Sequence, residues 1–70
     1  MSEFQLGDHP FITLNNLLKV LRFVSTGGEA NVVISNGLVQ VNGQLETQKR
    51  KKLYPGDEVV FQKHRVKIGL

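Results

Sequence analysis

Four consecutive cations, Lys49-Arg50-Lys51-Lys52, are the most specific chemical feature of this sequence. Neighbouring positive charges repel one another unless an anion neutralises them. Phosphate groups suit this role, because lysine offers point charges and arginine binds phosphate through two parallel hydrogen bonds. The alternative is a solvated loop, which is what most charge runs are. The run therefore predicts a contact with a polyanion.

A second candidate anion site lies at Ser25-Thr26-Gly27-Gly28. Thr26 and Glu29 have the spacing of a capping box, so a helix is predicted to begin here. The first amides of a helix have no partner within it and lie at the positive end of its dipole, which suits a phosphate. Thr26 can cap the helix or donate to a phosphate, but its one oxygen cannot serve both fully. The alternative is a plain helix–helix turn in which the glycines only allow the bend.

The remaining cations divide between a predicted helix and a predicted strand. Asn15, Lys19 and Arg22 fall on the polar face of the predicted first helix, where the two cations either offset the negative end of the helix dipole or contact the polyanion. Arg65 and Lys67 alternate with apolar residues, so they face away from the core, and a charged edge strand explains them well. Tyr54, close to the basic run, is the aromatic residue best placed to stack on a base.

The chain offers no assembled set of catalytic or metal-binding residues. His9 and His64 are far apart, and no third ligand lies at a suitable spacing. Asp57 and Glu58 are adjacent, so on a strand they would point to opposite faces and form no acid–base pair. The lack of cysteine excludes a disulfide framework and the usual zinc-ligand sets. We therefore expect no enzyme activity, no metal, no cofactor and no small-molecule substrate.

Composition is that of an ordinary globular chain. Seventy residues, 40% of them hydrophobic, predict a single domain over residues 1–70. Nine Lys and Arg against six Asp and Glu give a net charge of +3, which favours anionic partners. No apolar run approaches the ~20 residues of a membrane span, and the polar N-terminus is unlike a signal peptide. Together with the lack of cysteine, this favours a cytoplasmic location.

The spacing of apolar residues predicts two helices followed by short strands. Leu14, Leu17, Leu18 and Leu21 fall on one helical face, so a helix is predicted over residues 14–23 with Thr13 as its N-cap. A second, short helix is predicted between Thr26 and the stop at Asn36-Gly37, although the β-branched residues 32–34 favour a strand by propensity.

After Gly37 the apolar period becomes two. Asn42-Gly43 is a strong hairpin signal, and Tyr54-Pro55-Gly56-Asp57 predicts a turn. A short edge strand is also expected near the N-terminus. Strands are predicted at residues 4–6, 38–41, 44–47, 58–61 and 66–68, and residues 48–52 are predicted to be a charged connector.

Two motifs in this order resemble those of a known family. Residues 34–43 read Ile-Ser-Asn-Gly-Leu-Val-Gln-Val-Asn-Gly, and residues 54–59 read Tyr-Pro-Gly-Asp-Glu-Val. They resemble the I-x-x-G-x-V-x-V-N-G signature and the closing P-G-D-x-V/I turn of the S4-type RNA-binding domain, or αL motif. The resemblance covers residues 14–60. It implies an α+β, S4-like fold, with two helices followed by a small antiparallel sheet of short strands.

Residues 25–30 and 46–53 resemble more closely the free-standing bacterial branch of this family, the YbcJ/YaaA type, in which the domain is nearly the whole protein. The sequence departs from the family pattern at two positions. Many S4 domains place an arginine where Thr26 stands, and Asn31 occupies a helix position that is often basic. The basic run is therefore expected to carry more of the binding in this chain.

The resemblance and the charges together predict non-catalytic binding of structured RNA, such as ribosomal RNA or tRNA, with low sequence specificity. The rival hypothesis is a protein-interaction adapter associated with ribosomal or RNA-processing factors. DNA binding by a helix-turn-helix is disfavoured, because the second helix has no Arg or Lys for base edges. The expected RNA-binding residues are Lys49, Arg50, Lys51, Lys52, Thr26, Gly27, Gly28, Lys19 and Arg22, with Ser25, Asn31, Asn42, Tyr54, Arg65 and Lys67 as secondary candidates.

Overall fold

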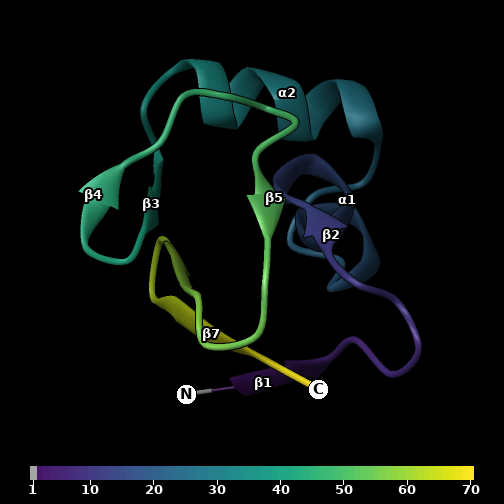
Figure 1. The fold of residues 1–70 in the computed structure, drawn as a ribbon. Helices are drawn as coiled ribbons and strands as arrows, with labels where there is room; N and C mark the ends of the chain where they lie inside the picture. The colour runs from purple at the N-terminus through teal and green to yellow at the C-terminus, as the bar shows by residue number, and fades with distance from the viewer. Residues whose placement is uncertain (1) are drawn as a thin grey trace.

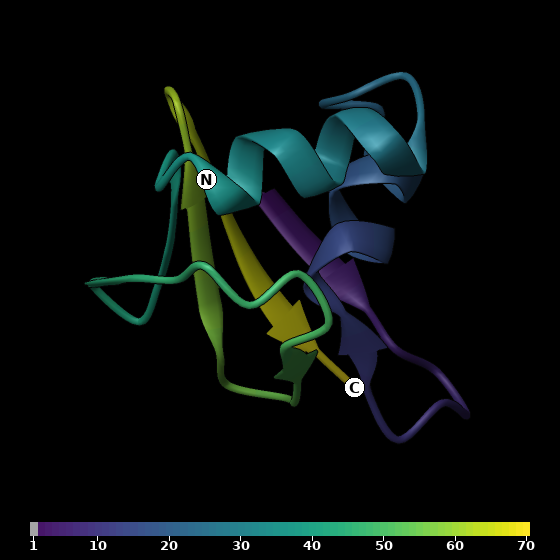
Figure 2. The same ribbon diagram turned by 90° about the horizontal axis from the view of Figure 1, so that it is seen from above.

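A computed structural model describes residues 2–70 and contains two helices and seven short strands. Figures 1 and 2 show the helices packed together on one side of the main sheet, with the chain ends near its β1 and β7 edge. The predicted α+β architecture is confirmed. The elements are β1 Ser2–Gln5, β2 Ile12–Thr13, α1 Leu14–Val20, α2 Gly27–Ser35, β3 Val39–Val41, β4 Gln44–Leu45, β5 Lys52–Leu53, β6 Glu58–Phe61 and β7 His64–Gly69.

The main sheet has five strands in the order β1-β7-β6-β3-β4. Its pairs are antiparallel as predicted, except that β1 runs parallel to β7, with Ser2 opposite Val66 and Gln5 opposite Gly69. A parallel pair needs a long crossover, and here the whole rest of the domain forms it. The predicted N-terminal edge strand is present, but it spans residues 2–5 and joins the C-terminal strand.

A second, two-stranded sheet pairs β2 with β5, placing Ile12 opposite Leu53 and Thr13 opposite Lys52. The sequence predicted only a charged connector here, because strands of two residues are too short to show a period. The pairing attaches the end of that connector to the segment that enters α1.

Helix α1 buries Leu14, Leu17 and Leu18 completely, which confirms the predicted leucine face. The helix ends at Val20, three residues earlier than predicted. Arg22 adopts a φ of 62°, and the amide of Phe23 donates to the Leu18 carbonyl at 3.0 Å. This is the Schellman arrangement, in which a residue in the left-handed region turns the chain away from the helix axis.

Helix α2 confirms that residues 32–34 are helical despite their β-branched side chains. The Thr26 hydroxyl accepts from the Glu29 amide at 3.1 Å, as the capping box predicts, and Glu29 Oε1 accepts from the Ser25 amide at 2.7 Å. Ala30 and Ile34 are fully buried against α1 and the sheet. Cap and core contacts together override the strand propensity of this segment.

The predicted hairpin joins β3 to β4 through Asn42 and Gly43, whose φ angles are 54° and 83°. Both values lie in the left-handed region that a type I′ turn requires. A side-chain clip then ties this turn to the next one. Asn42 Nδ2 donates to Asp57 Oδ1 at 3.0 Å, Asn42 Oδ1 accepts from the Glu58 amide at 2.9 Å, and Asp57 Oδ2 accepts from the Tyr54 amide at 2.8 Å.

The core lies between the helices and the sheet. It contains leucines of α1, Ala30 and Ile34 of α2, Leu53 of β5, and the inward residues of β3, β6 and β7, such as Val59, Phe61 and Ile68. Phe4 and Phe23 pack against it while partly exposed. Within residues 2–70, neither helix has the length and apolar character needed to cross a membrane.

Candidate nucleic-acid interface

The basic run leads into β5, and its backbone is held by the start of α1. The amides of Leu14 and Asn15 donate to the carbonyls of Lys51 and Lys49 at 2.9 and 3.0 Å. These bonds satisfy amides that have no partner within the helix. They also fix the backbone of the run, while the side chains of Lys49, Arg50 and Lys52 remain exposed.

An asparagine pair connects this segment to both helices. Asn15 Nδ2 of α1 donates to Asn31 Oδ1 of α2 at 3.3 Å. The two residues line a hollow of about 530 Å³ together with Gln48, Lys49 and Arg50. A second hollow, of about 290 Å³, shares Asn15 and Arg50 and adds Thr13 and Asn16. We call these two joined hollows the basic groove.

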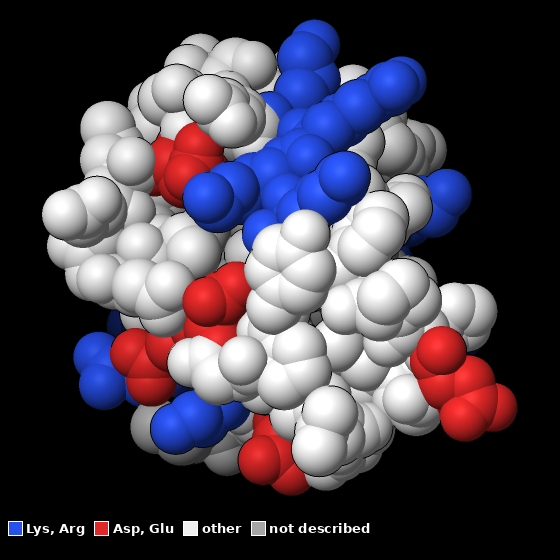
Figure 3. Space-filling view, viewed as in Figure 1, with Lys and Arg blue, Asp and Glu red and all other residues white. Residues whose placement is uncertain are grey.

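Figure 3 shows where positive charge gathers on this face of the molecule. Lys and Arg side chains form one group over the upper part of the view, where Figure 1 places the segment between β4 and β5. An Asp or Glu side chain adjoins this group on its left side. A polyanion lying across the basic groove would therefore meet several cations at once, which is the arrangement expected for phosphate backbones.

Gly27, at the start of α2, lies on the same face of this helix as Asn31, which lines the groove. Gly27 precedes Asn31 by one turn, so the two residues are about 6 Å apart along the helix axis. The helix N-terminus and the basic run, both predicted to bind RNA, are thus not directly adjacent, because Lys49 and Arg50 adjoin the middle of α2 rather than its first residues. Thr26 and Glu29 already serve as caps there, and the Glu29 carboxylate adds a negative charge beside the glycines.

Lys19 lies in the last turn of α1 and is exposed, one turn beyond Asn15. Arg22 is also exposed, but it lies after the helix end, so it does not continue the polar face predicted through Asn15 and Lys19. Ser25 is exposed, and its amide is bonded to Glu29. These residues therefore surround the loop between the helices rather than the groove itself.

Arg65 and Lys67 are exposed on β7, away from the basic groove residues. Lys67 is opposite Glu58 on one side and Glu3 on the other in the strand register. Opposite charges at facing positions stabilise neighbouring strands, which gives Lys67 a structural explanation. Asn42 likewise has a structural role through its bonds with Asp57 and Glu58.

Tyr54 is 48% exposed and lies against Phe11, with 6.0 Å between the ring centroids. Lys52 Nζ lies 5.0 Å from the centre of the Phe11 ring, within the range of a cation–π contact. Phe11 is half-buried beside the basic run, because β2 pairs with β5 and carries it to this surface.

Sequence reasoning missed four residues that line the basic groove: Thr13, Asn15, Asn16 and Gln48. Asn15 was assigned only to a polar helix face, and Gln48 to a connector. The backbone bonds from the start of α1 to Lys49 and Lys51 join segments more than thirty residues apart, and no local pattern predicts them. Within the described part of the chain, residues 2–70, no group of His, Cys, Asp or Glu is placed to hold a metal ion.

A family model of the S4 domain matches residues 4–69. The chain belongs to the S4 domain family. The match is wider than the predicted 14–60, since it includes half of β1 and all of β7. These two strands form one edge of the sheet, so they are part of the S4 domain and not an addition to it.

Relatives of this S4 domain match along nearly the whole chain. The protein named "Putative RNA-binding protein YbcJ" in Escherichia coli (strain K12) is 40% identical over 68 residues, which is 97% of each chain. YbcJ of Shigella flexneri is equally similar. The solution structure of YbcJ from E. coli, described as revealing an αL motif involved in RNA-binding, superimposes with a TM-score of 0.75. It is 38% identical and covers 100% of this chain and 89% of that one.

Proposed function

We propose that this S4 domain binds structured RNA through the basic groove and catalyses no reaction. The observation that carries the proposal is that Lys49 and Arg50 lie beside the Asn15–Asn31 pair, on a backbone segment held by α1. Cations alone attract any polyanion, but here amide side chains lie beside them and can bond to phosphate or 2′-hydroxyl oxygens. The similarity to YbcJ supports the same function.

The proposed RNA lies with its backbone across the groove. Arg50 lines both hollows, so its guanidinium can bind a phosphate at their junction through two hydrogen bonds. Lys49, Lys51 and Lys52 add point charges, and Thr26, Gly27 and Gly28 extend the contact along α2. A-form RNA presents its backbone and shallow minor groove, so low sequence specificity is expected.

The other predicted residues are assigned by position. Lys19 and Arg22 contact the RNA at the end of α1, Ser25 hydrogen-bonds to it at the loop between the helices, and Asn31 does so in the groove. Tyr54 offers an exposed ring against Phe11, the ring that Lys52 contacts, and an unstacked base can rest there. Asn42, Arg65 and Lys67 lie outside the basic groove, and we give them no more than a peripheral contact.

The test compares two triple variants that remove the same charge. We expect Lys49→Ala/Arg50→Ala/Lys51→Ala to weaken binding to a structured RNA and to lower the slope of log affinity against log salt by about one per lost phosphate contact. The control, Lys63→Ala/Arg65→Ala/Lys67→Ala, also removes three positive charges but lies outside the groove. Equal losses in the two variants would show attraction by net charge alone. Unchanged affinity of the first, with the fold intact by circular dichroism, contradicts the proposal.

The rival function is a protein adapter of ribosome-associated or RNA-processing factors, and one feature favours it. Leu38 and Leu45 are 54% and 61% exposed at the β3–β4 hairpin, and Leu45 packs over Gly37. Affinity of the purified protein for structured RNA at physiological salt separates the two functions, since an adapter would show none.

We propose the cytoplasm as the location, because an RNA-binding chain without cysteine suits a reducing compartment.

A further inference from the structure

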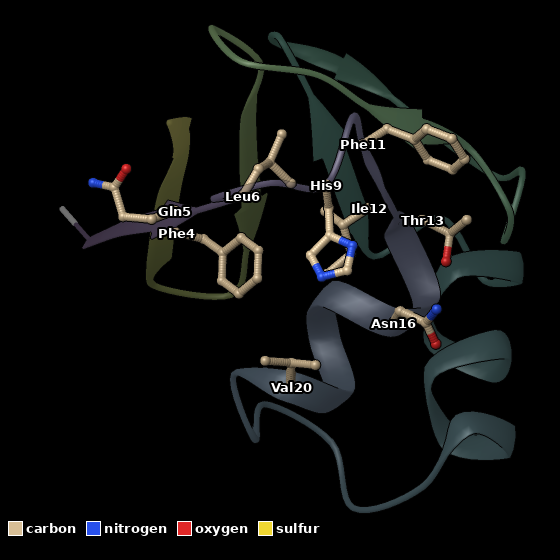
Figure 4. Close-up of a pocket in the computed structure, with 9 residues that line it drawn as sticks. All are labelled: Phe4, Gln5, Leu6, His9, Phe11, Ile12, Thr13, Asn16 and Val20. Carbon is tan, nitrogen blue, oxygen red and sulfur yellow. The ribbon is translucent and has the colours of Figure 1, made fainter. Parts of the chain in front are cut away.

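A hollow separate from the proposed phosphate contacts lies between the segment that joins β1 to β2 and the outer face of α1 (Figure 4). Its volume is about 390 Å³, at the small end of the range for ligand pockets. Its lining includes the apolar side chains of Phe4, Leu6, Ile12 and Val20 and the ring of His9. Val20 is 55% exposed, although it stands in a helix whose leucines are fully buried.

The pocket offers flat aromatic walls. Figure 4 shows the rings of Phe4 and His9 reaching into the hollow from the N-terminal segment, with Val20 facing them from α1. The ring of Phe11 points the other way, towards its partner Tyr54. A planar aromatic ligand can therefore lie against the rings of Phe4 and His9 with Val20 at its edge.

The pocket adjoins the basic groove. Thr13 and Asn16 line this pocket, and they also line the hollow that contains Arg50. Lys19 and Val20 lie three and four residues after Asn16, so all three residues share the outer face of α1. A phosphate bound at Arg50 would thus lie beside the apolar hollow, and Lys19 offers a second positive charge on the same face of α1.

We propose that this pocket accepts one unpaired nucleobase of the RNA bound in the groove, an inference that rests on the proposed function. A nucleotide combines a planar aromatic ring with an anionic phosphate, and the surface presents an aromatic pocket and cations side by side. Asn16 is exposed at the junction, and its amide both donates and accepts, so it can bond to the edge of the base. An apolar protein side chain would use the pocket without the flanking cations.

The experiment compares a blunt RNA duplex with the same duplex carrying two unpaired nucleotides at each 3′ end. Base stacking on aromatic side chains predicts that the full-length protein binds the second RNA about fivefold more tightly or better. His9→Ala and Val20→Gln should each reduce this gain to less than about twofold while leaving affinity for the blunt duplex unchanged. The matched control is Val32→Gln, since Val32 is 57% exposed on the other helix and lines none of these hollows.

A second readout does not depend on affinity. 2-Aminopurine placed at an unpaired position should lose fluorescence when it binds the unaltered protein, because stacking quenches it, and should keep its fluorescence with Val20→Gln. Duplex binding without any gain from unpaired nucleotides, or a gain that survives in both pocket variants, overturns the pocket proposal and leaves the groove standing. Loss of the gain in Val32→Gln as well would also overturn it. Absence of binding to either RNA ends both proposals.

Discussion

Arg22 occupies a backbone position at which helices usually place glycine. It is the first residue after the C-cap of α1, with a φ of 62°, and its amide donates to the Lys19 carbonyl at 3.0 Å. A side chain in the left-handed region costs about 1–2 kcal/mol relative to the right-handed one. A cation that remains in such a position supports the assignment of Arg22 to the RNA-binding surface.

The prediction at this scale is that Arg22→Gly stabilises the fold and weakens RNA binding. Relief of backbone strain exceeds the added freedom of glycine in the unfolded chain, so the free energy of unfolding should rise by about 0.5–1 kcal/mol. Urea unfolding measures this change. Arg22→Ala is the control, because it removes the charge and keeps the strain. It should weaken binding equally without the gain in stability, and a similar stability gain in Arg22→Ala would refute the assignment of strain.

At the scale of elements, α2 combines two opposing features at its first turn. Its free amides and dipole attract anions, whereas the Glu29 carboxylate already lies there and accepts from the Ser25 amide. In the free protein, the Glu29 carboxylate therefore already offsets the positive end of the helix dipole. A phosphate arriving at Gly27 and Gly28 would be repelled by this carboxylate, which limits how much the turn contributes to binding.

We therefore predict that Glu29→Gln raises affinity for structured RNA by about two- to fivefold. Repulsion between the Glu29 carboxylate and a phosphate at the helix N-terminus should cost about 0.4–1 kcal/mol of binding free energy, and the substitution removes it. The glutamine oxygen can still accept from Ser25, so the helix should lose less than about 1 kcal/mol of stability. Salt titration of RNA binding provides the measurement. Glu3→Gln makes the same chemical change on β1, outside the groove, and an equal gain there would mean that only the net charge matters.

At the scale of the whole molecule, the helices and the sheet share one core. Leu18 of α1 and Leu53 of β5 are fully buried in the same cluster as Ile68 of the C-terminal strand. A chain of this length is expected to have a free energy of unfolding of only about 3.5–10 kcal/mol. Neither the helices nor the sheet should therefore remain folded when the other unfolds. Residues 1–70 should therefore unfold as a single domain.

The chain allows this prediction to be tested with two probes. Circular dichroism follows the helices, while Tyr54, the single tyrosine in a chain without tryptophan, reports fluorescence from the corner between β5 and β6. Both signals should change at the same urea concentration. Leu18→Ala should lower the free energy of unfolding by about 2–5 kcal/mol and shift both transitions together. Transitions that separate would show two independent units.

The sequence by itself determined the features that depend on neighbouring residues. Thr26 and Glu29 marked the start of α2, Asn42-Gly43 marked the hairpin, and alternating residues 58–61 marked β6, all as the structure has them. Caps, turns and strand alternation act within about five residues, so their signals lie in short stretches of chain. Such signals were also sufficient to recognise the resemblance to the S4 domain family, because the motifs of this family consist of these turns and strands.

Only the tertiary structure decided which distant segments meet. The parallel pairing of β1 with β7, the pairing of β2 with β5, and the hydrogen bonds from the start of α1 to Lys49 and Lys51 have no local signal. The last two of these contacts also form the site: the hydrogen bonds bring the basic run to Asn15 and Asn31, and the β2–β5 pairing places Phe11 beside that run. Contacts of this kind depend on how the whole chain closes around its core, and two-residue strands leave no period in the sequence to predict them.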